Sequence, residues 1–247
     1  MSKERIDKLL VDLGIADSVV KAQALVMAGV VLADERRVDK PSESFAAATN
    51  IRIKGSENEL KFVGRGGIKL EHALETFAVS PSGQICLDIG ASTGGFTDCL
   101  LQHGAERVVA VDVGTNQLVW SLRNDARVDS RENTNARNLK PSDFDTRFGL
   151  AVMDVSFISA TKIIAGVLPL LTDDGKFIVL IKPQFEVEKG EVGQGGIVRD
   201  ADMQDRVVSE VNSFAESVGF TVKGLTESPI LGAEGNREFL AFYARQN

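Results

Sequence analysis

The stretch Cys86–Gly114, CLDIGASTGGFTDCLLQHGAERVVAVDVG, decides the fold class of this 247-residue chain. It contains two apolar runs, and each run ends in an aspartate, Asp88 in the first and Asp112 in the second. Three glycines, at positions 90, 94 and 95, follow the first run, and an apolar segment of helical character separates it from the second. This order predicts a strand, a glycine loop, a helix and a second strand, which is the opening unit of a nucleotide-binding α/β sheet.

The rest of the chain continues the alternation of strands and helices. Buried β-branched runs separated by helices predict a mostly parallel sheet with helices on both faces, in a Rossmann-like α/β domain. Such sheets bind ligands at the carboxyl ends of their strands. The predicted strands are 84–90, 107–113, 127–133, 149–155, 176–182, 220–228 and 237–245, and the main predicted helices are 95–103, 160–171 and 201–218.

The glycine spacing disfavours the two common phosphate-binding loops. A dinucleotide-binding loop would have the pattern G-x-G-x-x-G, whereas Gly90 is followed by Ala-Ser-Thr before the next glycine. A P-loop would need a lysine where Phe96 stands. Asp112 ends the second strand, where a carboxylate can accept both hydroxyls of a ribose. An adenosine ligand without pyrophosphate satisfies these features, and S-adenosylmethionine is the predicted cofactor. The predicted cofactor-binding residues are Asp88, Gly90, Ala91, Ser92, Gly94, Gly95, Phe96, Asp112 and Val113.

Four charged residues at element ends indicate the chemistry. Lys182 ends the apolar run KFIVLIK at the ligand edge of the sheet, and Asp154 ends the adjacent strand. Lys69 and Glu238 are expected to converge on them. A hydroxyl substrate needs a base to remove its proton, and Lys182 is the predicted base. The segment MDVSF lacks the prolines that follow this strand in methyltransferases acting on amino groups of DNA or protein. The two cysteines, Cys86 and Cys99, lie in elements unsuited to a catalytic nucleophile.

The first 60 residues predict a separate small domain. Two amphipathic helices, at residues 5–13 and 18–29, are followed by the short strand-like pieces VVLA, RRVD and IRIK. The segments RIDKLLVDLGIADS and KAQALVMAGVV resemble a small RNA-binding domain found in a ribosomal small-subunit protein, tyrosyl-tRNA synthetases and pseudouridine synthases. In that family arginine is usual at several positions that here are Val19, Gln23 and Val30. The resemblance implies RNA contacts by cations, for which the candidates are Lys3, Arg5, Lys8, Lys21, Arg36 and Arg37, with Arg65 beyond the domain.

The catalytic half resembles a known enzyme class. The segments Asp88–Phe96 and Asp112–Gly114 are similar to the cofactor motifs of Rossmann-type methyltransferases. The order Lys69, Asp154, Lys182, Glu238 is similar to the K-D-K-E tetrad of the FtsJ-like ribose 2′-O-methyltransferases. With the N-terminal unit included, nearly the whole chain resembles the TlyA-like, hemolysin A-type rRNA methyltransferases. The resemblance implies S-adenosylmethionine-dependent 2′-O-methylation of a cytidine in ribosomal RNA. The predicted division is a small RNA-binding domain at 1–60, a linker at 61–66 and an FtsJ-like methyltransferase domain at 67–247.

Composition narrows the function classes further. The net charge is −7, but residues 1–70 contain 12 basic and 10 acidic residues whereas the remainder contains 16 and 25, so RNA contacts are expected mainly in the first part. Neither a membrane-length apolar run nor a signal peptide is visible, and two histidines predict no metal site. We expect a cytoplasmic monomer whose partners are ribosomal RNA or ribosomal subunits. Two alternatives stay open: a non-catalytic RNA-binding or ribosome assembly factor on this fold, and a hemolysin.

Overall fold

The computed structural model describes residues 3–246 except 14, 17, 35, 47, 48, 50, 55–60 and 189. The chain divides into two compact units, Met1–Leu60 and Lys61–Asn247. Each unit has hydrophobic clusters of its own, so each is described by itself.

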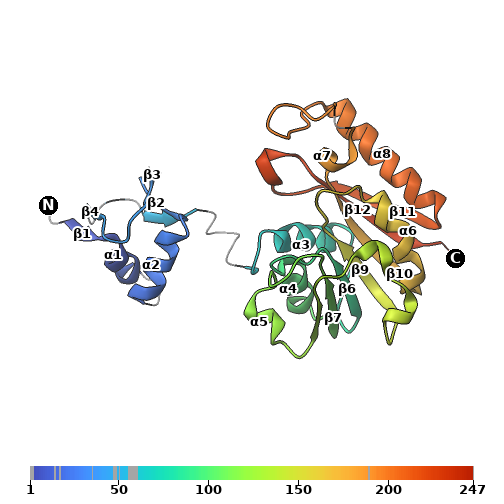
Figure 1. Ribbon diagram of the computed structural model, residues 1–247, viewed down its shortest axis with the longest axis horizontal. Coiled ribbons are helices and arrows are strands. Elements are labelled where there is room, and N and C mark those ends of the chain that lie inside the picture. The colour runs from blue at the N-terminus through green and yellow to red at the C-terminus, as the bar shows by residue number, and fades with distance from the viewer. Residues whose placement is uncertain are drawn as a thin grey trace. The chain divides into compact units, whose positions relative to one another are not determined.

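The N-terminal unit packs two helices against short strands (Figure 1). Ser18 caps the second helix by accepting the Lys21 backbone N–H at 3.3 Å. Apolar residues of both helices, among them Ile6, Leu10 and Val26, bury themselves against the central strand. The elements are α1 (Ile6–Asp12), α2 (Val19–Met27), a three-stranded sheet of β3 (Arg36–Arg37), β2 (Val31–Ala33) and β5 (Ile51–Ile53), and an additional antiparallel pair, β1 (Lys3–Arg5) and β4 (Ser44–Ala46). That additional pair was not predicted from the sequence.

The second unit is built on one seven-stranded sheet in the order β11-β12-β10-β9-β6-β7-β8 (Figure 1). The five strands from β10 to β8 run parallel, and β12 is antiparallel to both β10 and β11. This architecture confirms the predicted fold class. The strands are β6 (Ile85–Ile89), β7 (Arg107–Val111), β8 (Val128–Arg131), β9 (Phe148–Met153), β10 (Leu171–Ile181), β11 (Phe220–Glu227) and β12 (Phe239–Arg245).

Helices cover both faces of this sheet because its strands are apolar on both sides. In β6, Cys86 faces one hydrophobic cluster and Leu87 faces the other, as the alternation of side chains along a strand requires. The first cluster is shared with α3 (Gly66–Thr76), α4 (Gly95–Gln102) and α5 (Trp120–Arg123), and the second with α6 (Thr161–Val167) and α8 (Ala201–Ser217). Shorter elements complete the unit: α7 (Pro183–Glu186) and the 3-10 turns η1 (Ala136–Asn138), η2 (Pro141–Asp143), η3 (Leu168–Leu170) and η4 (Ala233–Gly235).

Residues 61–66, which the sequence presents as a linker, are part of the second unit. The Phe62 side chain is 3% exposed and lies so close to Gly67 that a Cβ there would be 2.3 Å from the Phe62 ring. The Val63 N–H donates to Asp98 Oδ2 at 2.8 Å. Helix α3 begins at Gly66, so this segment is fixed against α3 and α4.

Within the part of the chain that the structure describes, no helix combines the length and the apolar character needed to cross a membrane.

Candidate active site

The turn after β6 brings the backbone of two strands into contact. Gly90 has φ of +85°, and a Cβ at this position would lie 2.2 Å from the carbonyl oxygen of Asp154. Only glycine combines this left-handed conformation with so close an approach. The turn leaves the carboxyl ends of β6 and β9 side by side, and a cavity opens above them.

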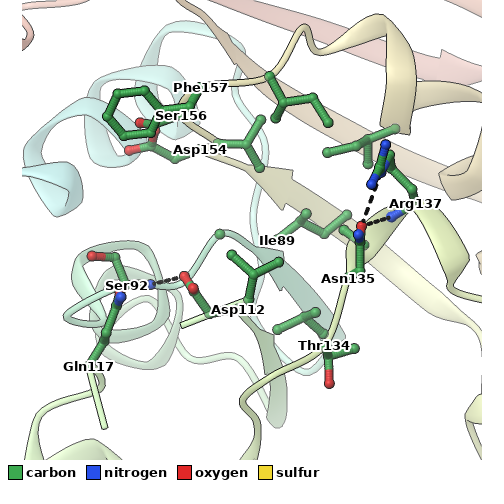
Figure 2. A pocket seen from close by; sticks show the side chains of 17 residues that line it. Ile89, Ser92, Asp112, Gln117, Thr134, Asn135, Arg137, Asp154, Ser156 and Phe157 are labelled. Atoms are coloured by element: carbon green, nitrogen blue, oxygen red, sulfur yellow. Dashed lines mark hydrogen bonds between the residues drawn. The ribbon is translucent and has the colours of Figure 1, made fainter. Parts of the chain in front are cut away.

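Asp112 lines that cavity, and two backbone groups hold its carboxylate. Its Oδ2 accepts the Ser92 N–H at 2.8 Å, and its Oδ1 accepts the Gly114 N–H at 2.7 Å. Figure 2 shows the Asp112 carboxylate reaching toward Ser92 along the wall of the cavity. Each carboxylate oxygen has a second lone pair, so Asp112 can accept two hydroxyls of a ligand while it stays fixed.

Two neighbouring cavities, of about 470 and 130 Å³, follow the glycine turn. Gly90, Ser92 and Asp154 line both of them. The larger cavity has the volume of a small-molecule site, and both apolar and polar side chains line it. Of the nine residues predicted to bind the cofactor, seven line one cavity or the other: Gly90, Ala91, Ser92, Gly95, Phe96, Asp112 and Val113.

Asp88 and Gly94 are not among the lining residues. Gly94 caps α4 with φ of +104° and packs beneath Leu122. Asp88 is fully buried, and its Oδ2 accepts the Thr97 hydroxyl at 2.6 Å. Burial raises the pKa of Asp88 to about 7, and the nearby Asp154 and Asp112 carboxylates contribute to the rise. The structure therefore puts this carboxyl under the loop, where it ties β6 to α4.

The four predicted catalytic residues form two ion pairs at the carboxyl edge of the sheet. Lys69 on α3 donates to Glu238, and both side chains are buried. Lys182 Nζ lies 2.5 Å from Asp154 Oδ1. Ile181 pairs with Phe239 in the antiparallel ladder of β10 and β12, so Lys182 and Glu238 follow at the next register position.

The two ion pairs adjoin the cavities. Asp154 lines both cavities, and Gly66, one turn before Lys69 on α3, lines the smaller one. A buried cation beside a buried anion is the arrangement expected where charge must be held close to a reacting group. The geometry thus joins a ligand cavity to a cluster of two amines and two carboxylates.

Comparison with known proteins shows the family to which the chain belongs. The FtsJ-like methyltransferase model matches residues 62–245, and the S4 domain model matches residues 4–44. The chain belongs to the FtsJ-like methyltransferase family. The family resemblance drawn from the motifs and from the N-terminal unit is therefore confirmed.

Relatives of this methyltransferase carry two kinds of name. The present chain is 43% identical to Hemolysin A of Brachyspira hyodysenteriae, and the match covers 97% of this chain and 99% of that protein. It is 42% identical to the 16S/23S rRNA (cytidine-2′-O)-methyltransferase TlyA of Mycobacterium tuberculosis, over 99% of this chain and 91% of that one. A solved structure from Streptococcus thermophilus, named provisionally as a hemolysin, matches with a TM-score of 0.78 and 46% identity. That match covers 100% of this chain and 90% of the other.

Part of the cavity wall of this methyltransferase was missed by sequence reasoning. The segment Thr134–Arg137, after β8, and the segment Val155–Ile158, after β9, both line the larger cavity. Figure 2 shows Asn135 and Arg137 on one side of the cavity, opposite Ser156 and Phe157. Their position in the sequence could have indicated that they line the site, because both segments follow strands at the carboxyl edge of the sheet.

The cations predicted to contact RNA differ in how they are held. Arg5 donates twice to the buried Asp7 carboxylate, at 3.0 and 2.6 Å, and these bonds lower the pKa of Asp7 to about 2. Arg5 is thus committed to the structure of its unit. Arg36 and Arg37 have side chains 80% and 63% exposed. The remaining candidates are Lys8 and Lys21, both exposed, Arg65, exposed where α3 begins, and Lys3, whose side chain lies outside the described part of the chain.

Proposed function

We propose that this protein transfers a methyl group from S-adenosylmethionine to the 2′-hydroxyl of a ribose, that of a cytidine in ribosomal RNA. The observation that carries the proposal is a cavity lined by both Asp112 and Asp154, with Lys182 paired to Asp154. Asp112 suits the ribose of an adenosine ligand, and the ion pair suits a hydroxyl that must lose its proton. The names of the TlyA relatives support the rRNA substrate and the cytidine.

The residues present fit the cofactor. The glycine turn lets a ligand lie against the backbone, and Asp112 keeps one lone pair on each oxygen for a ribose hydroxyl. When bound, S-adenosylmethionine supplies a methyl group on a sulfonium that is a good leaving group. The protein's task is then mainly to hold the target hydroxyl in line at near-attack distance.

The four charged residues divide the remaining work. Lys182 takes or polarises the proton of the target hydroxyl, and Asp154 orients Lys182 through the 2.5 Å contact. Lys69 on α3 and Glu238 beside β12, paired with each other, fix the ribose and the amine. Assistance by a positioned base contributes about 10²–10⁴-fold to such a reaction.

The N-terminal unit contributes affinity for RNA in this proposal. The S4 domain match and the exposed side chains of Arg36 and Arg37 support this role. Contacts with phosphates make binding weaken as the salt concentration rises, because binding releases counterions from the RNA and this release is less favourable at high salt.

A methyl-transfer assay on ribosomal subunits separates the proposed function from its alternatives. Labelled methyl from S-adenosylmethionine should appear in rRNA, and mapping of modified riboses should find a 2′-O-methylcytidine that is absent from RNA incubated without the protein. Binding of subunits without label in the RNA would favour an assembly factor. Lysis of erythrocytes by the purified protein, absent from an equally pure Lys182→Ala preparation, would favour a hemolysin.

A further inference from the structure

Lys182 is held by two partners and not by one. Its Nζ contacts Asp154 Oδ1 at 2.5 Å and donates to Ser156 Oγ at 2.9 Å. A lysine nitrogen has three directions beyond its bond to Cε, which carry three N–H donors in the ammonium form, or two N–H donors and one lone pair in the neutral amine. Two fixed partners set the rotation of the group about its terminal bond. They leave the third direction for the target hydroxyl, as an N–H that polarises it or as the lone pair that takes its proton.

Ser156 lies where it can connect the ion pair with the cavity. It follows β9 two residues after Asp154, and it lines the larger cavity together with Asp154 and Phe157 (Figure 2). The hydroxyl therefore reaches Lys182 from the cavity side, whereas Glu238 neighbours Lys182 across the sheet.

The loop that carries Ser156 is docked on the helix that follows Lys182. The Phe157 and Phe185 rings lie 5.0 Å apart, and the Ala160 N–H donates to Glu186 Oε1 at 2.7 Å. Phe185 and Glu186 both belong to α7, which begins directly after Lys182. These two contacts between the two short segments hold Ser156 at a fixed place relative to Lys182.

We infer that Ser156 is a positioning residue for methyl transfer, which acts by fixing the Lys182 amine so that its third, unoccupied direction meets the target hydroxyl. This inference rests on the proposed function. Without the Ser156 hydroxyl, the amine keeps its contact with Asp154 but can rotate about it. The chemical step then slows because fewer orientations of the amine are productive, whereas cofactor binding is preserved.

Three variants of the full-length protein test this role. Ser156→Ala removes the acceptor, Ser156→Thr keeps a hydroxyl, and Ser159→Ala is the control in the same loop. Ser159 contacts Thr161 Oγ1 at 2.7 Å and hydrogen-bonds Glu186. Its removal takes a hydroxyl from the same loop but leaves the Phe157–Phe185 and Ala160–Glu186 contacts and the Lys182 partners in place. Single-turnover methyl transfer at saturating ribosomal subunits and calorimetry with S-adenosylmethionine measure the chemical step and cofactor affinity separately.

We expect Ser156→Ala to slow single-turnover transfer by about tenfold, the effect of losing one hydrogen bond to a charged group, with cofactor Kd within about twofold of the parent. Ser156→Thr should recover most of the rate, and Ser159→Ala should stay near the parental rate. The inference is overturned if Ser156→Ala transfers methyl as fast as the parent, if it loses only cofactor affinity, or if the threonine variant is as slow as the alanine variant. A parent protein that methylates no ribose would overturn the proposed function instead.

Discussion

The buried carboxyl of Asp88 should make the stability of the methyltransferase unit depend on pH. Burial raises its pKa from 3.8 to about 7 in the folded protein, whereas in the unfolded chain the carboxyl is solvated. A raised folded-state pKa contributes stability that is fully present below pH 3.8 and is lost as the pH rises through 7. The difference of about three pKa units corresponds to about 4 kcal/mol of unfolding free energy, of which about 2 kcal/mol is lost between pH 5.5 and 8.5.

Asp88→Asn removes this titration and keeps an oxygen that can accept the Thr97 hydroxyl. Between pH 5.5 and 8.5, the unfolding free energy of the cofactor-free parent should fall by about 2 kcal/mol more than that of the Asn variant. Urea unfolding followed by far-ultraviolet circular dichroism at the two pH values measures this difference. Asp173→Asn, at a side chain 89% exposed, is the matched control and should follow the parent.

The N-terminal unit is the same in all three proteins, so its contribution to the unfolding curves cancels in the comparison. If the Asn variant loses stability in parallel with the parent across this pH range, Asp88 is not the titrating group. The assignment of a buried carboxyl that is largely protonated below neutral pH would then have to be abandoned.

Three further predictions concern ligand binding and catalysis. Lys182→Arg should bind S-adenosylmethionine as the parent does but transfer methyl about 100-fold more slowly, because guanidinium does not lose its proton. Parental single-turnover rates in this variant from pH 6 to 9 would exclude Lys182 as the base. Asp112→Ala should weaken S-adenosylmethionine binding by about 1–3 kcal/mol and Asp112→Asn by less, as calorimetry can measure; unchanged affinity in the alanine variant would remove Asp112 from the site. In the loop Pro183–Asp200, the amides of the exposed Gln194 and Gly195 should exchange rapidly and gain protection when ribosomal subunits bind. Val198, whose N–H donates to the buried Asn236 side chain at 3.0 Å, should be protected throughout. Equal exchange at Gln194 and Gly195 with and without subunits would mean that the loop does not close over RNA.

The sequence alone determined the fold class, the glycine turn after β6 and the order of the four charged residues. Strand and helix periodicities are local, so the apolar runs at β6, β7 and β9 are visible without any tertiary contact. Gly90 and Asp112 could be predicted for the same reason, since a strand end followed by a glycine or an acid is a short-range pattern. The antiparallel pair of β1 and β4 escaped prediction because β1 is the charged segment Lys-Glu-Arg, which carries no apolar alternation.

The tertiary structure decided which of these groups meet and which are buried. Lys69 pairs with Glu238 from 169 positions away, and that choice depends on strand register and on how α3 packs, neither of which local periodicity reports. The same packing buries Asp88 beneath the glycine turn that follows β6. It also fixes residues 61–66 against α3 and α4 instead of leaving them as a linker. Ser156 looked like an ordinary loop residue in the sequence. Only the docking of its loop on α7 brings its hydroxyl to Lys182, because a hydrogen bond requires a position in space that no spacing along the chain specifies.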